Sequence, residues 1–168
     1  YLQPASTYGR LRTAIINASQ RVCGNRFGRG WIRPGAAAPI GDPLRRDLLA
    51  TLQNFMPDLV QVNTLMRTSR SVQARFQGVG TLGAPAARDL GTTGVVARAC
   101  GLELDLRRTL PGAAYGAAPL PSSQQASGDC WARMCQRMDE AVHSGHWLID
   151  RLTGPALALD PPPAPHAR

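Results

Sequence analysis

Apolar residues recur every three or four positions in three stretches of the sequence, which predicts three long helices. The clearest begins at Asp42-Pro43, where Asp can cap a helix and Pro fits the first turn. Its apolar pattern stays in phase across Pro57, so we expect one helix kinked near Gln53–Met56, with two helices split at Pro57 as the alternative. The apolar positions of this helix are Leu44, Leu48, Leu52, Phe55, Leu59, Val62 and Met66.

The first helix should start at Ser6 or Thr7, whose hydroxyls can cap it, and stop at Gly24. Its apolar positions are Leu11, Ala14, Ile15, Ala18 and Val22. The stretch that follows, residues 26–39, mixes glycines with large apolar residues, and we interpret it as an irregular loop or a short hairpin.

The last long helix should be capped by Ser127 or Asp129 and end at Gly154. Its apolar positions are Trp131, Met134, Cys135, Met138, Val142, Gly145, Ile149 and Leu152. A glycine costs about 1 kcal/mol inside a helix, so its place among these positions indicates close packing against another helix.

A glycine-rich stretch, Arg75 to Arg107, lies between the second and last helices and holds six of the 17 glycines. We predict a short β-like piece over residues 75–82, then two short helical pieces stopped by Gly91 and Gly101. Apolar residues alternate with the glycines, which favours a tightly packed irregular core segment over a linker. These residues are Phe76, Val79, Leu82, Leu90, Val95 and Val96.

The remaining segments are rich in proline. Thr109 to Ser127 contains three prolines and is predicted to be an extended loop, and residues 155–168 form a Pro-rich tail that we expect to be disordered. The fold class is therefore mainly α, with three long helices and short β pieces. We divide the chain into a core, residues 1–154, and the tail, residues 155–168.

The chain is basic, with a net charge of +8, and all 19 of its cationic side chains are arginine. Basic domains raise the question of nucleic-acid binding. Here the arginines are scattered, only 5% of residues are aromatic, and no recognition motif accompanies them. Arginine also pairs with carboxylates through two hydrogen bonds at once, which suits a subunit interface better.

Metal and nucleotide chemistry lack their usual sequence patterns. The four cysteines form no Cys-x-x-Cys pair, and His143 and His146 have no third ligand, so we expect no bound metal and two solvated histidines. Gly78-Val79-Gly80 is not followed by Gly-Lys-Ser/Thr, and no nucleophile elbow is present, which argues against nucleotide binding and against a hydrolase. No apolar run is long enough to cross a bilayer.

Four motifs occur in an order that resembles one family. In sequence order they are GNRFGRGWIRPG at Gly24–Gly35, RFQGVGTL with AARDLGTTGVVARACGLELDLR between Arg75 and Arg107, Pro111 with Tyr115, and GDCWAR at Gly128–Arg133. Across Tyr8 to Leu152 the chain is similar to the large-subunit family that contains the 49 kDa quinone-site subunit of complex I and the large subunits of group 4 membrane-bound nickel–iron hydrogenases.

This resemblance implies the middle part of a hydrogenase-like large subunit, within a membrane-associated multisubunit oxidoreductase. Such enzymes pass electrons from NADH, formate or a ferredoxin through iron–sulfur clusters to quinone or protons. The quinone or nickel–iron centre would belong to the full subunit and the clusters to a small iron–sulfur partner, so this fragment would bind no cofactor and hold no catalytic residue. The segment NRFGRG followed by RPG resembles the hydrogenase branch of the family more than the complex I branch. Membrane subunits would be further partners, which places the chain peripherally on the cytoplasmic side of the inner membrane.

Asp105 and Arg107 match the family pattern, which implies a structural ion-pair role. In a strand-like segment, residues two apart share a face and do not easily pair with each other, so each should bond a group outside residues 104–108. We expect both to be partly or fully buried. The candidate partners for Arg107 are loop carbonyls or a carboxylate such as Asp129 or Asp89. Those for Asp105 are backbone N–H groups or an arginine such as Arg75 or Arg98.

The predicted site therefore consists of framework and interface residues. The structural ion pairs, with a position beside quinone or a cluster as the alternative, are expected among Arg75, Arg88, Asp89, Arg98, Asp105 and Arg107. The interface with the small subunit is expected at Arg26, Arg29, Trp31 and Arg33. Cys100, Ala36 and Gly112 depart from the family pattern, which leaves a diverged, non-catalytic scaffold or interaction protein as the second hypothesis. A basic nucleic-acid-binding domain is the third.

Overall fold

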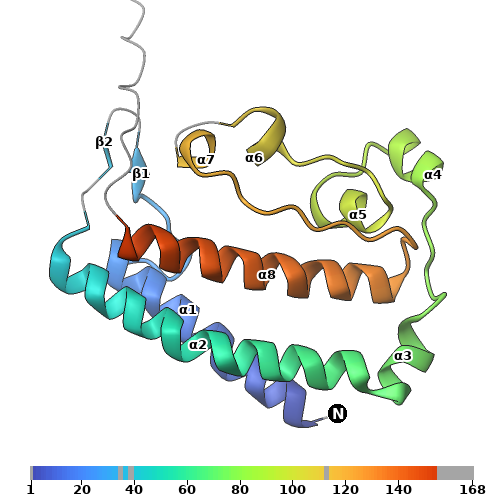
Figure 1. Cartoon of the computed structure of the whole chain (residues 1–168), viewed down its shortest axis with the longest axis horizontal. Coiled ribbons are helices and arrows are strands. Elements are labelled where there is room, and N and C mark those ends of the chain that lie inside the picture. Colours follow the sequence, from blue (N-terminus) through green and yellow to red (C-terminus); the bar gives the residue numbers. More distant parts are fainter. Residues whose placement is uncertain (1, 34–35, 38–39, 112–113, 155–168) are drawn as a thin grey trace, which may run out of the picture.

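The computed structural model describes residues 2–33, 36–37, 40–111 and 114–154, and the predicted tail lies outside them. Three long helices dominate, as predicted, and α2 packs against both α1 and α8 (Figure 1). Residues 70–111 and 114–127 form short helices and loops, and part of this segment covers α8 on the side away from α2. The elements are α1 Leu2–Cys23, β1 Ile32–Arg33, β2 Ala36–Ala37, α2 Asp42–Thr68, α3 Arg70–Phe76, α4 Ala84–Asp89, α5 Gly94–Ala99, α6 Leu106–Thr109, α7 Ala114–Ala117 and α8 Cys130–Thr153.

Helix α1 begins earlier than the sequence suggested. Ser6 and Thr7 lie inside the helix, and both hydroxyls donate back to the carbonyl of Gln3 instead of capping. The predicted start was therefore wrong, because these hydroxyls can satisfy a helical carbonyl as readily as a free backbone N–H. The stop before Gly24 is confirmed, and Gly24 has a φ of 70°.

Helix α2 runs without interruption through Pro57, which confirms one helix over two, and Pro57 is exposed. Its N-cap is Gly41, and Asp42 is the first helical residue, so the predicted cap is displaced by one position. Four residues of the predicted apolar pattern are buried, namely Leu48, Leu52, Leu59 and Val62. The pattern missed Met56, which joins Leu11, Leu59 and Val62 in the main hydrophobic cluster.

Gly145 on α8 lies directly against Met56 on α2. A Cβ atom built at Gly145 would overlap the sulfur of Met56, and Gly145 is buried. This confirms the close helix packing that the glycine predicted, because the absence of a side chain at Gly145 leaves the space that Met56 fills.

Asp129 caps α8, as one of the two predicted alternatives stated. Its carboxylate accepts hydrogen bonds from the backbone N of Ala132 at 2.7 Å and of Gly78 at 2.8 Å, while Ser127 supports it by donating at 2.9 Å. Burial would raise the pKa of Asp129, but these hydrogen bonds outweigh it and hold the pKa below its ordinary value. The cap thus also ties the start of α8 to the glycine-rich stretch.

The glycine-rich stretch departs from the prediction at its start. No strand forms over residues 75–82: α3 ends at Phe76, and Gly78 and Gly80 have φ values of 70° and 61°, which no strand accommodates. The two short helices, α4 and α5, end at Asp89 and Ala99, and their caps Leu90 and Cys100 are followed by Gly91 and Gly101, as predicted.

A second cluster of buried residues stabilises this stretch. It consists of Ala87, Ala97, Cys100 and Leu102. Two apolar residues that the sequence placed in a core are instead open to solvent, with exposed fractions of 49% for Val79 and 71% for Leu90. Small residues therefore do the packing here, because the short helices approach one another closely.

The remaining loops contain more regular structure than expected. Helix α7 lies within the segment predicted to be wholly extended, and Ala118 just after it accepts a hydrogen bond from the indole Nε1 of Trp147 at 2.8 Å. Strands β1 and β2 pair antiparallel, Ile32 with Ala37 and Arg33 with Ala36, which agrees with the predicted short hairpin. No helix within the described residues is long and apolar enough to cross a membrane.

Candidate functional site: an arginine-centred polar network

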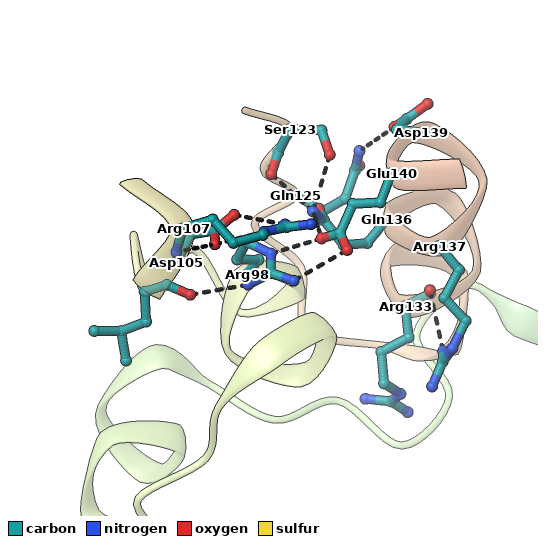
Figure 2. Close-up of polar contacts among 11 residues, drawn as sticks. Arg98, Asp105, Arg107, Ser123, Gln125, Arg133, Gln136, Arg137, Asp139 and Glu140 are labelled. Carbon is teal, nitrogen blue, oxygen red and sulfur yellow. Dashed lines mark hydrogen bonds and ion pairs between the residues drawn. The ribbon is translucent and has the colours of Figure 1, made fainter. Parts of the chain in front are cut away.

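Arg98 on α5 lies at the centre of a network of polar side chains between the glycine-rich stretch and α8 (Figure 2). Its side chain is 11% exposed. Nε donates to Oε1 of Glu140 at 2.6 Å and Nη2 donates to Oε2 at 3.0 Å, which is the paired geometry that guanidinium and carboxylate groups prefer. Nη1 donates to the carbonyl of Leu104 at 2.9 Å, so Arg98 also fixes the backbone ahead of α6.

Gln136 connects this ion pair to the loop before α8. It is fully buried, one turn before Glu140, and its Nε2 donates to Glu140 Oε1 at 2.7 Å and to the carbonyl of Ser123 at 2.7 Å. Burial would raise the pKa of Glu140, but the hydrogen bonds from Arg98 and Gln136 and the nearby positive charges lower it overall. Glu140 is therefore held as a carboxylate.

Asp105 and Arg107 pair with each other, contrary to the sequence prediction. Arg107 Nε donates to Asp105 Oδ1 at 2.9 Å and Nη2 donates to Oδ2 at 2.6 Å. The segment is a helical turn and not a strand: Asp105 caps α6 by accepting from the backbone N of Arg107, which brings the two side chains onto one side. The expected partial burial is confirmed, with side chains 13% and 30% exposed for Asp105 and Arg107.

The Asp105–Arg107 pair lies close enough to the Arg98 group to be coupled to it electrostatically. The hydrogen bond from Arg107 lowers the pKa of Asp105, and the charge of Arg98 lowers it further. The hydrogen bond to Asp105 raises the pKa of Arg107, and the charge of Glu140 adds to this. Two arginines and two carboxylates thus meet at the junction of α5, α6 and α8, where the charges of each kind stabilise the other.

Three predicted members of the network lie elsewhere. Arg75, Arg88 and Asp89 are exposed, and none makes an ion pair with any described residue. They sit in the last turns of the short helices α3 and α4, where their side chains reach water. The prediction of a buried network therefore fails for these three residues.

Two of the four predicted interface residues lie against an exposed aromatic ring. The guanidinium carbons of Arg26 and Arg29 lie 4.7 and 5.5 Å from the ring centre of Phe27, which is 63% exposed. Trp31 is half-buried beside an apolar groove between α1, α2 and the end of α8, and its Nε1 has no hydrogen-bond partner among the described atoms. The side chain of Arg33 lies outside the described part of the structure.

Sequence reasoning missed the two residues of α8 that complete the network, Gln136 and Glu140. Their spacing of four places them on one helix face, which was a usable signal. Of the two histidines, His146 is exposed, but Nδ1 of His143 is buried without a partner among the described atoms, so the expectation of two solvated histidines holds only for His146. No three metal-ligating side chains come together within the described ranges.

Comparison with known proteins assigns a family. The family described as "Respiratory-chain NADH dehydrogenase, 49 Kd subunit" matches residues 3–155. The chain belongs to this 49 kDa subunit family. The match runs from the first turn of α1 to the end of α8, so the polar network lies wholly within the family region.

Individual members of the 49 kDa family align over most of the chain. It is 33% identical to an NADH-quinone oxidoreductase subunit of Rhodospirillum rubrum over 162 residues, covering 94% of this chain and 41% of that protein. It is 38% identical to an NADH-quinone oxidoreductase subunit of Salinispora arenicola, covering 87% of this chain and 40% of that protein. It is 32% identical to NADH dehydrogenase (ubiquinone) iron-sulfur protein 2 of Arabidopsis thaliana, covering 84% of this chain and 36% of that protein. The chain thus spans about two fifths of the length of these relatives.

The pKa shifts predict acid-sensitive stability. The pKa values of Asp105, Asp129 and Glu140 are all lowered on folding, so the unfolded chain binds more protons as the pH falls. Their stabilisation should be present above about pH 5 and be lost as the pH falls through the folded values, below about pH 4. Urea unfolding across this range should show the decline. In Asp129→Asn, which keeps a capping side chain without the titration, the decline should be shallower; an unchanged decline would contradict this account.

Proposed function

We propose that this chain forms the structural framework in the quinone-reducing subunit of an NADH–quinone oxidoreductase. The single observation that carries the proposal is the family match over residues 3–155. Relatives named as NADH-quinone oxidoreductase subunits support quinone as electron acceptor and NADH as donor. The fold this implies is the middle part of a hydrogenase-like large subunit, with the catalytic centre elsewhere in that subunit.

The role we assign to these residues is mechanical. Arg98, Glu140 and Gln136 fasten short helices and irregular backbone to a long helix, and Asp105 with Arg107 shapes the turn beside them. Irregular backbone keeps one shape only when side chains satisfy its polar groups, and the carbonyls of Leu104 and Ser123 are satisfied in this way. Such a framework would position a quinone site or an electron-transfer partner without taking part in the chemistry.

The partner we propose is the small iron–sulfur subunit, bound through residues 26–33. Phe27 presents an exposed aromatic ring between two arginines. Aromatic residues and arginines are the residue types that most often anchor protein interfaces. The clusters would lie in that partner, and quinone would bind the complete subunit. Membrane subunits would hold the assembly peripherally on the cytoplasmic side of the inner membrane.

A chimaera tests this proposal. Residues 3–155 would replace the matched region of the Rhodospirillum rubrum relative, with assembly followed on native gels and activity as NADH–quinone reduction by membranes. We expect an assembled complex with measurable turnover. A chimaera carrying Arg107→Ala should assemble less while each assembled complex keeps its turnover. Normal assembly with turnover lost would instead place Arg107 on the reaction path, and failure of the parent chimaera to assemble would contradict the framework proposal.

A further inference from the structure

Leu106 on α6 and Leu110, which caps the end of that helix, are both largely open to solvent. Leu106 is 73% exposed and Leu110 is 76% exposed. The backbone N of Leu110 donates to the carbonyl of Leu106 at 3.0 Å, so the two lie one helical turn apart and on the same side. Paired leucines open to solvent mark an interaction surface more often than isolated ones do. Arg108 lies between them in sequence, and we call these three residues the α6 surface.

A cavity of about 230 Å³ opens beside the α6 surface. Arg108 and Thr109 from α6 line one side, and Ser122 and Ser123 from the loop before α8 line another. Sites for cofactors and drug-sized ligands are commonly about 300–1,000 Å³. This cavity is smaller than that, and its polar lining suits the side chain of a bound polypeptide.

The charges around the cavity define what it can bind. Arg98 is neutralised by Glu140, and Asp105 by Arg107. The two remaining charged lining residues are Arg108 and Glu103, both exposed, and neither makes an ion pair with the described residues. A carboxylate on an occupant would complement Arg108, and an N–H donor would complement Glu103. An extended peptide offers both, an acidic side chain and a backbone amide.

We propose that the α6 surface and its cavity bind an acidic–aliphatic peptide segment of a partner protein. An Asp or Glu of that segment pairs with Arg108 in the cavity, and a neighbouring aliphatic side chain packs on Leu106 and Leu110. The net charge of +8 further favours an acidic partner. The inference deepens the proposed function, since it rests on the chain being part of an assembly, but it concerns a surface distinct from residues 26–33.

Peptide binding to the intact chain tests the proposal. The probes are three fluorescent peptides at physiological salt: alternating Leu and Glu, alternating Leu and Lys, and alternating Ser and Glu. We expect the Leu–Glu peptide to bind most tightly in fluorescence anisotropy. Leu106→Asp and Arg108→Glu should each weaken its binding by about tenfold. The matched controls are Leu90→Asp, a leucine 71% exposed at the end of α4, and Arg88→Glu, an exposed arginine of the same helix.

The controls separate a built site from general charge attraction. Equal binding of the Ser–Glu peptide, equal weakening in the α4 controls, or no binding of the Leu–Glu peptide would each overturn the proposal. NMR shifts of the unchanged chain provide a second measurement that does not depend on variants folding: they should change at residues 103–110 and 122–124, and shifts confined to other residues would overturn it. Because the chimaera is not used, failure here is distinguishable from failure of the proposed function.

Discussion

Replacing Arg98 with Met should destabilise the chain by about 3–5 kcal/mol. The substitution leaves Glu140 as a partly buried carboxylate without its two guanidinium hydrogen bonds and frees the carbonyl of Leu104. Stranding one member of such a pair costs more than the pair contributes, because the remaining charge has lost its water as well as its partner. Urea unfolding followed by circular dichroism measures the loss.

A matched arginine provides the control for this prediction. Arg10 forms an ion pair with Asp58, but both side chains are substantially exposed, at 63% and 37%. Arg10→Met should therefore change the unfolding free energy by less than about 1 kcal/mol. If Arg98→Met were as mild as Arg10→Met, burial of the network would not contribute to stability in the way we describe.

Gly128→Ala should be the most damaging glycine substitution, costing about 3–4 kcal/mol. Gly128 has a φ of 63°, and a Cβ atom there would overlap the backbone carbonyl of Leu82. The backbone cannot move aside easily, since Gly128 N donates to Ala99 O at 2.8 Å and its own carbonyl accepts from Leu82 N at 3.0 Å. For a chain of this length the melting temperature should fall by roughly 6–16 °C.

Gly91 separates the two causes of this cost. It has a φ of 62°, nearly the same as Gly128, but nothing lies within 4 Å of a Cβ atom built there. Gly91→Ala should therefore cost only the backbone strain, about 1–2 kcal/mol. Equal melting temperatures for the two variants would show that the contact with Leu82 is relieved by a small shift, contrary to this prediction.

The long helices and several of their ends could be predicted because their signals are local. Repeated apolar spacing defines α1, α2 and α8, and Asp129 and Gly101 mark helix ends through properties of single residues. The packing at Gly145 was predictable for the same reason, since a glycine among the apolar positions of a helix leaves room for a second helix to approach closely.

The polar network was only partly predictable, because its contacts join distant parts of the chain. Arg98 and Glu140 are 42 residues apart, and nothing in their local sequence identifies each as the other's partner. Asp105 and Arg107 were misjudged for a different reason. Over so short a segment, a spacing of two fits either a strand or the cap of a helical turn, and the pairing reverses between them.

The coupling between Arg98 and Glu140 is one of the contacts that fasten the glycine-rich stretch to α8, and a double-mutant cycle measures it directly. Arg98→Met, Glu140→Leu and the double variant would be compared with the parent chain by urea unfolding. We predict that the double variant is less destabilised than the two single variants together, by about 2 kcal/mol or more, because no charge is left stranded. Additivity within about 0.5 kcal/mol would contradict the claim that this pair joins the two parts of the fold.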